Sequence, residues 1–319
     1  MGEPLSFAEA LGKTEGQQRA LLLGNGFSAS HFDYATLLES ALPEDSTLRA
    51  VFDHLGTNDF EKVVEALSQA SHVEKALGHA DRADALAEDA ASLKRELILA
   101  IAKVHPDSGS ALGDQVTACA AFLGKFRSIF TTNYDLLLYW VRMNDSLSFT
   151  DGFGKGTSNG HLHGPFVPDA QRNIHYLHGA LHLFVHEKGI YKVRRSSKDR
   201  LIEIIRNLVC DKKIPPKFVF EGSSEDKRRS IEASPFLKQA LKRLQENRRV
   251  LFVYGSSLSA NDAHIYEAVF GSKATQVFVS VYDHDDLPYL KGEVARYVSR
   301  AEWHGSVEYY DARSAAVWG

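Results

Sequence analysis

Glycines and small polar residues interrupt the first apolar run of this chain in a pattern that could hold a nucleotide. Residues 19–23 end at Gly24-Asn25-Gly26-Phe27-Ser28. Glycines there would let the backbone approach a pyrophosphate, and a helix beginning behind them would offer unpaired N–H groups. The dinucleotide fingerprint fails, because Ala29 replaces its third glycine and no strand ends in an acidic residue about 20 positions later. A hydride-transferring dehydrogenase is therefore disfavoured, and a plain strand-to-helix turn stays open.

A second polar segment, Phe130-Thr131-Thr132-Asn133-Tyr134-Asp135, lies where a predicted strand meets a predicted helix. The carboxyl ends of parallel strands are where such sheets bind ligands. Asn133 offers both a donor and an acceptor, which suits ribose hydroxyls or a carboxamide. The alternative is structural, since Thr132 or Asn133 would then only cap a helix at residues 134–141.

Two further turns follow predicted strands. Tyr176-Leu177-His178-Gly179 places an imidazole at a strand end, and Tyr254-Gly255-Ser256-Ser257 places hydroxyls where phosphates or ribose could bind. A lone histidine is more often structural, and the second turn could be a simple loop. Other histidines occupy positions 175, 182 and 186. A strand does not bring residues at steps of four onto one ion, so we expect no metal.

The helices and strands that would position these turns are predicted from regular apolar patterns in the sequence. Apolar residues recur at three- and four-residue steps over 60–77 and 86–101, which predicts two successive amphipathic helices. The last third alternates strands and helices, which favours a parallel sheet with helices on both faces. Its predicted strands are 250–254 and 276–282, and its predicted helices are 234–247 and 262–270.

We therefore expect a Rossmann-like, doubly wound α/β fold with a mostly parallel sheet. An inserted helical layer would span about 58–104. A small middle β-hairpin region would pair residues 180–186 with 189–193.

Composition excludes several classes of protein. The 319 residues include 37 Lys and Arg against 41 Asp and Glu, and the net charge of −4 gives no reason to expect nucleic-acid or membrane binding. The short basic runs Lys192–Arg195 and Lys227–Arg229 are typical of solvated faces. Two cysteines are too few for a zinc ribbon. Because no signal pattern and no long apolar run occurs, we expect a cytoplasmic protein.

The order of the four turns resembles that of the sirtuin superfamily. Sirtuins carry a Gly-Ala-Gly-x-Ser turn, a Thr-Gln-Asn-x-Asp strand end, a catalytic His-Gly and a Gly-Ser-Ser turn. These are similar to residues 24–28, 131–135, 178–179 and 255–257. The chain lacks the paired Cys-x-x-Cys motifs of sirtuin deacylases and has Asn25 where they have alanine. These losses resemble the zinc-free sirtuin-like proteins of bacterial anti-phage systems, which hydrolyse NAD+.

The resemblance implies a single sirtuin-like NAD+-binding domain over 1–319, with a helical insertion at about 35–110 and a variable insertion at about 145–235. It implies an NAD+ glycohydrolase with NAD+ as substrate and no metal. Asn133 would orient the nicotinamide ribose or the attacking water, Asp135 would help to hold the carboxamide, and His178 would be the general base. The remaining implied contacts to NAD+ are Gly24, Asn25, Gly26, Phe27, Ser28, Thr132, Gly255, Ser256, Ser257 and Asp283, the last of which could instead only form a turn.

Other classes of function stay open. The chain could be an inactive sensor of NAD+ or ADP-ribose, or an NAD+-dependent deacylase, although deacylases build their peptide groove partly from the zinc module. The resemblance also implies control by homo-oligomerisation or by a partner protein. The helical insertion would then cover the NAD+ cleft or form a subunit interface. The segment Gly222–Lys227 could be a ligand lid or an ordinary loop.

Overall fold

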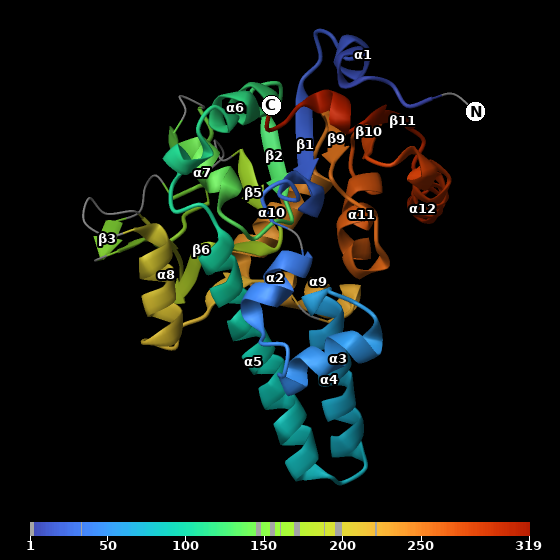
Figure 1. Ribbon diagram of the computed structural model, residues 1–319. Coiled ribbons are helices and arrows are strands. Elements are labelled where there is room, and N and C mark those ends of the chain that lie inside the picture. Colours follow the sequence, from blue (N-terminus) through green and yellow to red (C-terminus); the bar gives the residue numbers. More distant parts are fainter. Residues whose placement is uncertain are drawn as a thin grey trace.

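The computed structural model describes residues 3–32, 34–144, 148–153, 157–159, 161–168, 173–187, 189–194, 200–220 and 222–319. At its centre lies a six-stranded sheet in the order β11-β10-β9-β1-β2-β5, with every neighbouring pair parallel (Figure 1). The strands are β1 (Arg19–Leu23), β2 (Ser128–Thr131), β5 (Ile174–Tyr176), β9 (Val250–Tyr254), β10 (Gln276–Val281) and β11 (Ser306–Asp311).

The strand order reverses beside β1. The chain runs outward from β1 to β5 and then fills the other side of β1 from β9 to β11. Residues 20–23 of β1 are buried, as expected for a central strand that is covered on both faces. Open sheets of this kind bind ligands beyond the carboxyl ends of the strands at such a reversal, which here lies between β1 and β9.

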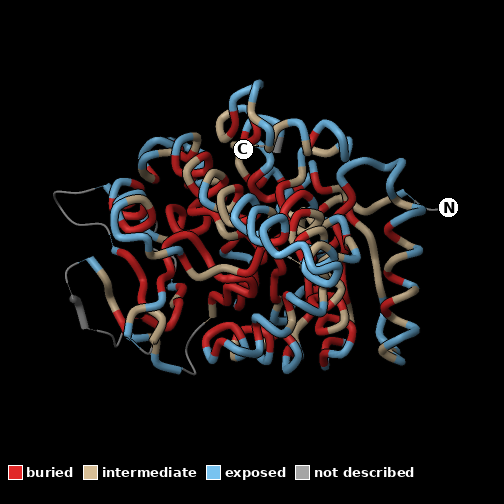
Figure 2. Tube along the Cα trace, turned by 90° about the horizontal axis from the view of Figure 1, so that it is seen from below, coloured by how far each residue is buried: buried red, intermediate tan, exposed pale blue. Residues whose placement is uncertain are grey.

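Helices surround the sheet, and the Rossmann-like α/β class predicted from the sequence is confirmed. Buried residues gather in the middle of the molecule and exposed residues on the outer helices (Figure 2). The helices are α1 (Phe7–Gly12), α2 (Tyr34–Ala41), α3 (Thr47–Leu55), α4 (Phe60–Ala76), α5 (Ala80–Val104), α6 (Gln115–Leu123), α7 (Leu137–Asn144), α8 (Leu201–Cys210), α9 (Ser224–Glu232), α10 (Pro235–Gln245), α11 (Ala263–Phe270) and α12 (Leu287–Ala301).

The two predicted amphipathic helices are α4 and α5. They pack against each other as a hairpin that projects from the molecule (Figure 1). The half of α5 nearer the sheet buries Leu93, Leu97 and Ile101, and it also contacts α2 and α8. The insertion is therefore joined to the main body by the carboxyl-terminal half of α5.

The middle of the chain forms a second sheet that is larger than the predicted hairpin. The predicted pairing of β6 (Gly179–His186) with β7 (Gly189–Val193) is confirmed. The antiparallel order is β3-β4-β7-β6-β8, with β3 (Thr157–Asn159), β4 (Leu162–Gly164) and β8 (Pro216–Phe218). The extra strands are three residues each, too short to leave an alternating pattern in the sequence.

The interpretation of Lys192–Arg195 as a solvated basic run is wrong for Lys192, and Arg195 lies outside the described residues. Lys192 is buried, and its Nζ lies 2.6 Å from Asp151 Oδ2, which Arg142 also contacts at 3.1 Å. Burial disfavours the Asp151 carboxylate, but these two cations outweigh it and lower its pKa to about 2.

The segment Gly222–Lys227 is neither a lid nor a loop from residue 224 onward, because α9 begins there. Ser223 and Asp226 form a capping box, in which each side chain accepts a hydrogen bond from the backbone N–H of the other residue. Lys227 is buried with 1% of its surface exposed, so the interpretation of Lys227–Arg229 as a solvated run is wrong for Lys227, while Arg229 is exposed.

The strand predicted over 276–282 is confirmed as β10, but it is not the last strand of the sheet. After Asp283 the chain forms α12 and returns as β11, which pairs with β10 along its full length. This edge strand contains Glu308 and two tyrosines, and only Tyr310 in it is buried. Its weak apolar pattern explains why the sequence did not reveal it. Among the described residues, no helix is both long and apolar enough to cross a membrane.

Candidate functional site

The glycine turn after β1 and the turn after β9 touch each other across the strand reversal. Gly24 N donates to Tyr254 O at 2.9 Å, and Gly26 N donates to Gly255 O at 2.8 Å. A Cβ atom on Gly24 or Gly26 would lie 2.6 Å from the backbone of Gly255. These glycines are therefore required by the close packing of two loops, whatever ligand lies above them.

The expected helix does not begin directly behind this turn, since α2 begins only at Tyr34, and four of the turn's five residues use their own N–H groups within the protein. Besides the two glycine donors, Phe27 N donates to Gly24 O and Ser28 N to Asn25 O, because residues 25–27 form a 3₁₀ turn. The turn after β9 has more unpaired backbone N–H groups in the part of the chain that the structure describes. Among the described residues, no hydrogen bond engages the N–H of Ser256 or Ser257. Any phosphate contact through backbone amides is therefore expected at the turn after β9.

Replacing Gly255 with alanine should lower the free energy of unfolding by about 1–3 kcal/mol. Gly255 has φ +68°, and a Cβ there would lie 2.7 Å from Phe27 N. Chemical denaturation followed by circular dichroism measures the change. Gly292→Ala in α12 is the matched control, since its Cβ meets nothing within 4 Å and should be neutral or stabilising.

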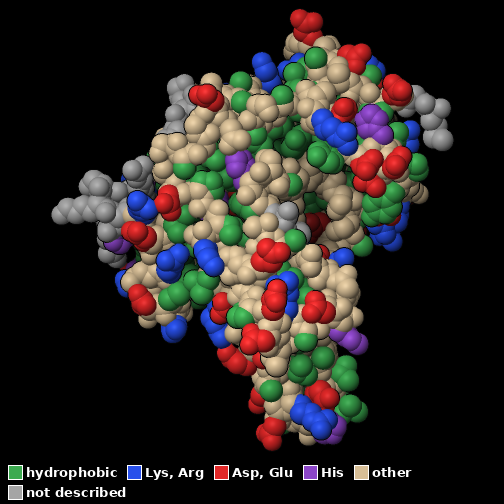
Figure 3. All heavy atoms as spheres, in the orientation of Figure 1, with side chains coloured by type: hydrophobic (Ala, Val, Ile, Leu, Met, Phe, Trp, Pro, Cys, Tyr) green, Lys and Arg blue, Asp and Glu red, His purple; other side chains and the backbone are tan. Residues whose placement is uncertain are grey.

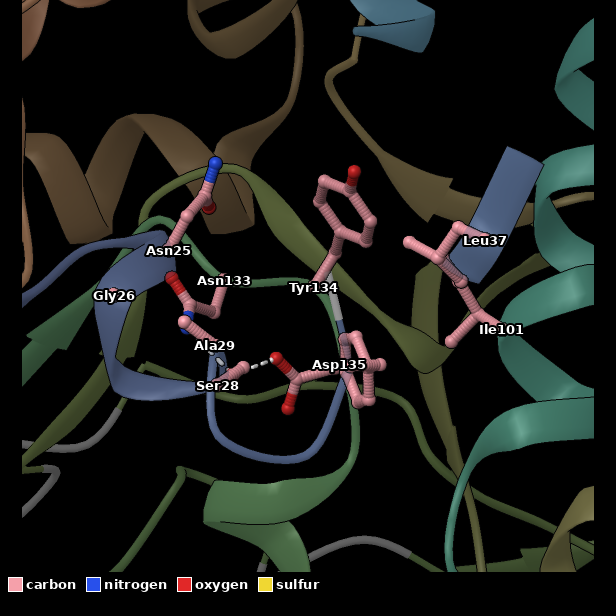
Figure 4. Close-up of a pocket in the computed structure, with 10 residues that line it drawn as sticks. Asn25, Gly26, Ser28, Ala29, Leu37, Ile101, Asn133, Tyr134 and Asp135 are labelled. Atoms are coloured by element: carbon pink, nitrogen blue, oxygen red, sulfur yellow. Dashed lines mark hydrogen bonds between the residues drawn. The ribbon is translucent and has the colours of Figure 1, made fainter. Parts of the chain in front are cut away.

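Ser28, Asn133 and Asp135 form a hydrogen-bonded chain (Figure 4). Asn133 Nδ2 donates to Ser28 Oγ at 3.0 Å, and Ser28 Oγ donates to Asp135 Oδ2. The other Asp135 oxygen accepts Leu137 N at 2.8 Å. Asp135 therefore caps the start of α7, a role the sequence had offered to Thr132 or Asn133. One of the two N–H groups of the Asn133 amide is used in this chain.

The oxygen of Asn133 is buried and has no hydrogen-bond partner among the described residues. A buried acceptor without a partner costs free energy, so a native site usually supplies one from water or a ligand. Here the acceptor belongs to a residue that lines a cavity.

The Asn133 cavity has a volume of about 180 Å³ and two unlike walls. Asn133 and Asp135 form the polar wall, while Leu37 from α2 and Ile101 from α5 face them across the space (Figure 4). An apolar cavity of roughly 150 Å³ accommodates a benzene ring, so this one is of a size for a single substituted aromatic ring. The helical insertion thus supplies a wall of this cavity.

His178 lies beside a second cavity of about 260 Å³, which shares Asn25 and Tyr134 with the first. We call it the His178 cavity. Its other lining residues include Thr132, Ser257 and Asp262. Residues from two distant segments, Thr132 after β2 and Ser257 and Asp262 after β9, therefore meet the histidine turn at the carboxyl edge of the sheet.

A cluster that the sequence did not predict surrounds His178. Its Nε2 lies 3.0 Å from His264 Nε2 and 3.9 Å from Asp262 Oδ1. Lys227 Nζ contacts Asp262 Oδ1 at 3.0 Å and Glu61 Oε2 at 2.6 Å. The three residues His178, Asp262 and His264 each place one ligand atom within 4.8 Å of the others, a spacing that a metal ion could bridge. Asp262 and His264 follow the Gly-Ser-Ser turn closely, and this was the available signal.

Burial dominates the proton affinities in this cluster. It lowers the pKa of His178 to about 4, although Asp262 opposes the shift. It also lowers the pKa of His264. Burial raises the pKa of Glu61 to about 7 in spite of Lys227. Both imidazoles are therefore neutral near pH 7, which is the state that a general base needs.

A third and larger cavity, the Trp318 cavity, continues from the glycine turn toward β10 and β11. It has a volume of about 750 Å³ and is lined by Gly26, Ser257 and Trp318 among others. The Arg313 guanidinium lies 4.8 Å from the centre of the Tyr282 ring, and both line this cavity. It shares Gly26 and Ala29 with the Asn133 cavity, so a long ligand could occupy both. Figure 3 shows this face of the molecule hollowed above the helical insertion.

Other predicted contact residues lie apart from the cavities. Phe27 is in the core, where its carbonyl accepts Trp318 Nε1 at 2.7 Å. Gly24 lines none of the three cavities. Asp283 is exposed and accepts Asp285 N at 3.1 Å, as a turn-forming residue does, and Asp286 lines the Trp318 cavity in its place.

Comparisons with known proteins give one family match and several structural ones. A family model described as a domain of unknown function, DUF4917, matches residues 21–318. The structure is similar to that of Sir2Tm bound to a propionylated peptide, at 15% identity over 97% of this chain and 92% of that chain, with a TM-score of 0.39. It is also similar to a Sir2 homologue in complex with NAD, at 15% identity over 94% and 97% of the two chains, with a TM-score of 0.38. No curated protein matches the chain. Because both TM-scores lie below 0.5, function must be inferred from the site.

Proposed function

Since the chain belongs to the family described as a domain of unknown function, DUF4917, we propose a function from its site: the protein binds NAD+ and hydrolyses the bond between nicotinamide and ribose. One observation carries this proposal. Asn133 is buried, donates to Ser28 and lines a cavity of a size for one aromatic ring, and its oxygen has no hydrogen-bond partner among the described residues. The cavity of the neutral imidazole of His178 adjoins it.

We assign the three cavities to the three parts of NAD+. The nicotinamide ring would lie in the Asn133 cavity, with Asp135 near its carboxamide. The nicotinamide ribose would lie toward the His178 cavity. The adenosine diphosphate would continue past Gly26 and Ser257 into the Trp318 cavity, where Arg313 supplies a positive charge and Tyr282 an aromatic surface.

The reaction needs one base and no acid, and that is what the site offers. When the bond between C1′ and the pyridinium nitrogen breaks, nicotinamide takes both electrons and leaves as a neutral molecule. Water then adds to C1′ of the oxocarbenium-like ribose and loses one proton. The oxygen of Asn133 would accept a hydrogen bond from that water or from a ribose hydroxyl, and His178 would take the proton.

The sirtuin resemblance carries the proposal further, to a regulated enzyme that depletes NAD+ in anti-phage defence. Leu37 and Ile101 make the helical insertion part of the site wall, so a partner or a second copy that moved the insertion would open or close the Asn133 cavity. Light scattering of the purified chain with and without NAD+ would show whether assembly accompanies binding.

Asn133→Ala should lower the rate of nicotinamide release from NAD+ by about 10²-fold, because it removes a preorganised hydrogen-bond acceptor. Mass spectrometry of free nicotinamide measures the rate. Asn207→Ala, an exposed asparagine on α8, is the matched control and should keep full activity. Equal rates for Asn133→Ala and the wild type would contradict the assignment.

A further inference from the structure

His178 and His264 face each other through the same ring atom. Their Nε2 atoms lie 3.0 Å apart, the rings are stacked with centroids 5.2 Å apart, and both side chains are buried. At this distance one nitrogen must donate and the other must accept, because two N–H groups or two lone pairs would repel. The direction of the hydrogen bond decides which atom of His178 remains for chemistry.

Ser224 contacts the other nitrogen of His264. Its Oγ lies 2.9 Å from His264 Nδ1 and accepts the backbone N–H of His264 at 2.8 Å. The hydroxyl can donate its own proton to a bare Nδ1 or accept a hydrogen bond from Nδ1–H through its second lone pair. The contact is therefore compatible with a proton on His264 Nδ1 and a lone pair at Nε2, toward His178, and the groups around the pair decide between the two directions.

The groups around the pair favour the same direction once a proton is taken up. Asp262 raises the proton affinity of His178, while Lys227 opposes it, and Glu61 reaches the pair only through Lys227. Burial lowers the pKa of both rings. The carboxylate oxygen Asp262 Oδ1 lies 3.9 Å from His178 Nε2, and among the described residues Asp262 forms no ion pair with His264. The negative charge therefore favours the added proton on His178. Its ring then has N–H groups at both nitrogens and can meet His264 Nε2 only as a donor.

We propose that His264 is a positioning residue that accepts a hydrogen bond from His178 Nε2 and leaves His178 Nδ1 as the proton acceptor of the site. Its part in turnover rests on the proposed hydrolysis, in which Nδ1 takes the proton that the attacking water loses. The direction of the hydrogen bond between His178 and His264 does not depend on the proposed hydrolysis. This arrangement fits better than a metal ion held by His178, Asp262 and His264. The ammonium of Lys227, 3.0 Å from Asp262 Oδ1, already supplies the positive charge that an ion would bring.

The direction of the hydrogen bond can be measured without turnover. Nitrogen NMR of the full chain labelled with ¹⁵N-histidine reports which ring atom carries the proton, and His178→Ala assigns the signal. The expected result at pH 7 is a neutral His178 ring protonated at Nε2. A proton on Nδ1 instead would overturn the proposal. This NMR result tests the direction of the hydrogen bond even if the wild type releases no nicotinamide. In that case only the proposed function fails.

Kinetics test the positioning role. His264→Ala should lower kcat for nicotinamide release about 10- to 100-fold and leave KM unchanged, because His264 acts only through His178. Water should reach the His178 ring, and the acid limb of the kcat profile should move up toward pH ~6.5. His264→Gln keeps an acceptor oxygen and should recover part of the rate.

Three results would overturn the positioning role. One is an unchanged kcat in His264→Ala. Another is a lower kcat with an unmoved acid limb, which would show a merely structural residue. The third is wild-type activity that is lost to a chelator and restored by Zn²⁺ or Mn²⁺, which would identify the cluster as a metal site.

Discussion

Replacing His178 with alanine should lower the rate of nicotinamide release by about 10²- to 10⁴-fold, the usual contribution of a general base. The affinity for NAD+ should change little, since the imidazole is needed for proton transfer in the proposed mechanism. The wild-type rate should stay flat between pH 5.5 and 8, where a group with a pKa of about 4 is neutral, and fall only below that range. A stopped nicotinamide assay beside calorimetric NAD+ binding measures both quantities.

His186→Ala is the matched control for this prediction. His186 ends β6, the strand that begins just after His178, and its ring packs against Tyr191. It lines none of the three cavities, so the variant should keep full activity. Equal losses in both variants would assign the effect of His178→Ala to the second sheet and not to a base.

Lys227→Met should lower the free energy of unfolding by about 3–5 kcal/mol, because it leaves the carboxylates of Glu61 and Asp262 near each other without their shared cation. The ammonium is buried and binds both groups. Burial disfavours it, yet the attraction of the two carboxylates wins and raises the pKa of Lys227. Urea denaturation of the variant and the wild type measures the loss.

The loss of stability in Lys227→Met should decrease as pH falls. Burial raises the pKa of Glu61 to about 7, and an unfolded glutamate titrates near 4.5. A group with a raised folded pKa binds more protons in the folded state, so its charge costs stability as pH rises through that window. The effect of Lys227→Met should therefore be smaller at pH 5 than at pH 8. Lys242→Ala, which removes an exposed pair with Glu246, should cost less than about 1 kcal/mol at either pH.

Most of the sheet and its functional edge could be predicted from the sequence because strand ends carry local signals. The apolar run before Gly24 and the run before Tyr254 became β1 and β9, the two strands at the reversal of strand order. Ser28 and Asn133 are separated by more than a hundred residues but are brought into contact because both follow strands of one parallel sheet.

The predictions that failed concern tertiary contacts, which no local sequence pattern shows. The glycines of the first turn look like a phosphate cradle, but their amides are used by the neighbouring loop. Lys227 lies in a hydrophilic stretch and is buried only because Glu61 and Asp262 converge on it from other elements. His264 lies on the mostly apolar α11, and only the tertiary fold brings its ring to His178.

One measurement tests the central claim most directly: incubation of the purified full chain with NAD+ alone, followed by quantification of nicotinamide and ADP-ribose, and then the same reaction with an acetyl-lysine peptide. Hydrolysis predicts equal amounts of the two products without peptide and no acetylated ADP-ribose with it. Nicotinamide release only in the presence of the peptide, or NAD+ binding with no release under either condition, would contradict the claim.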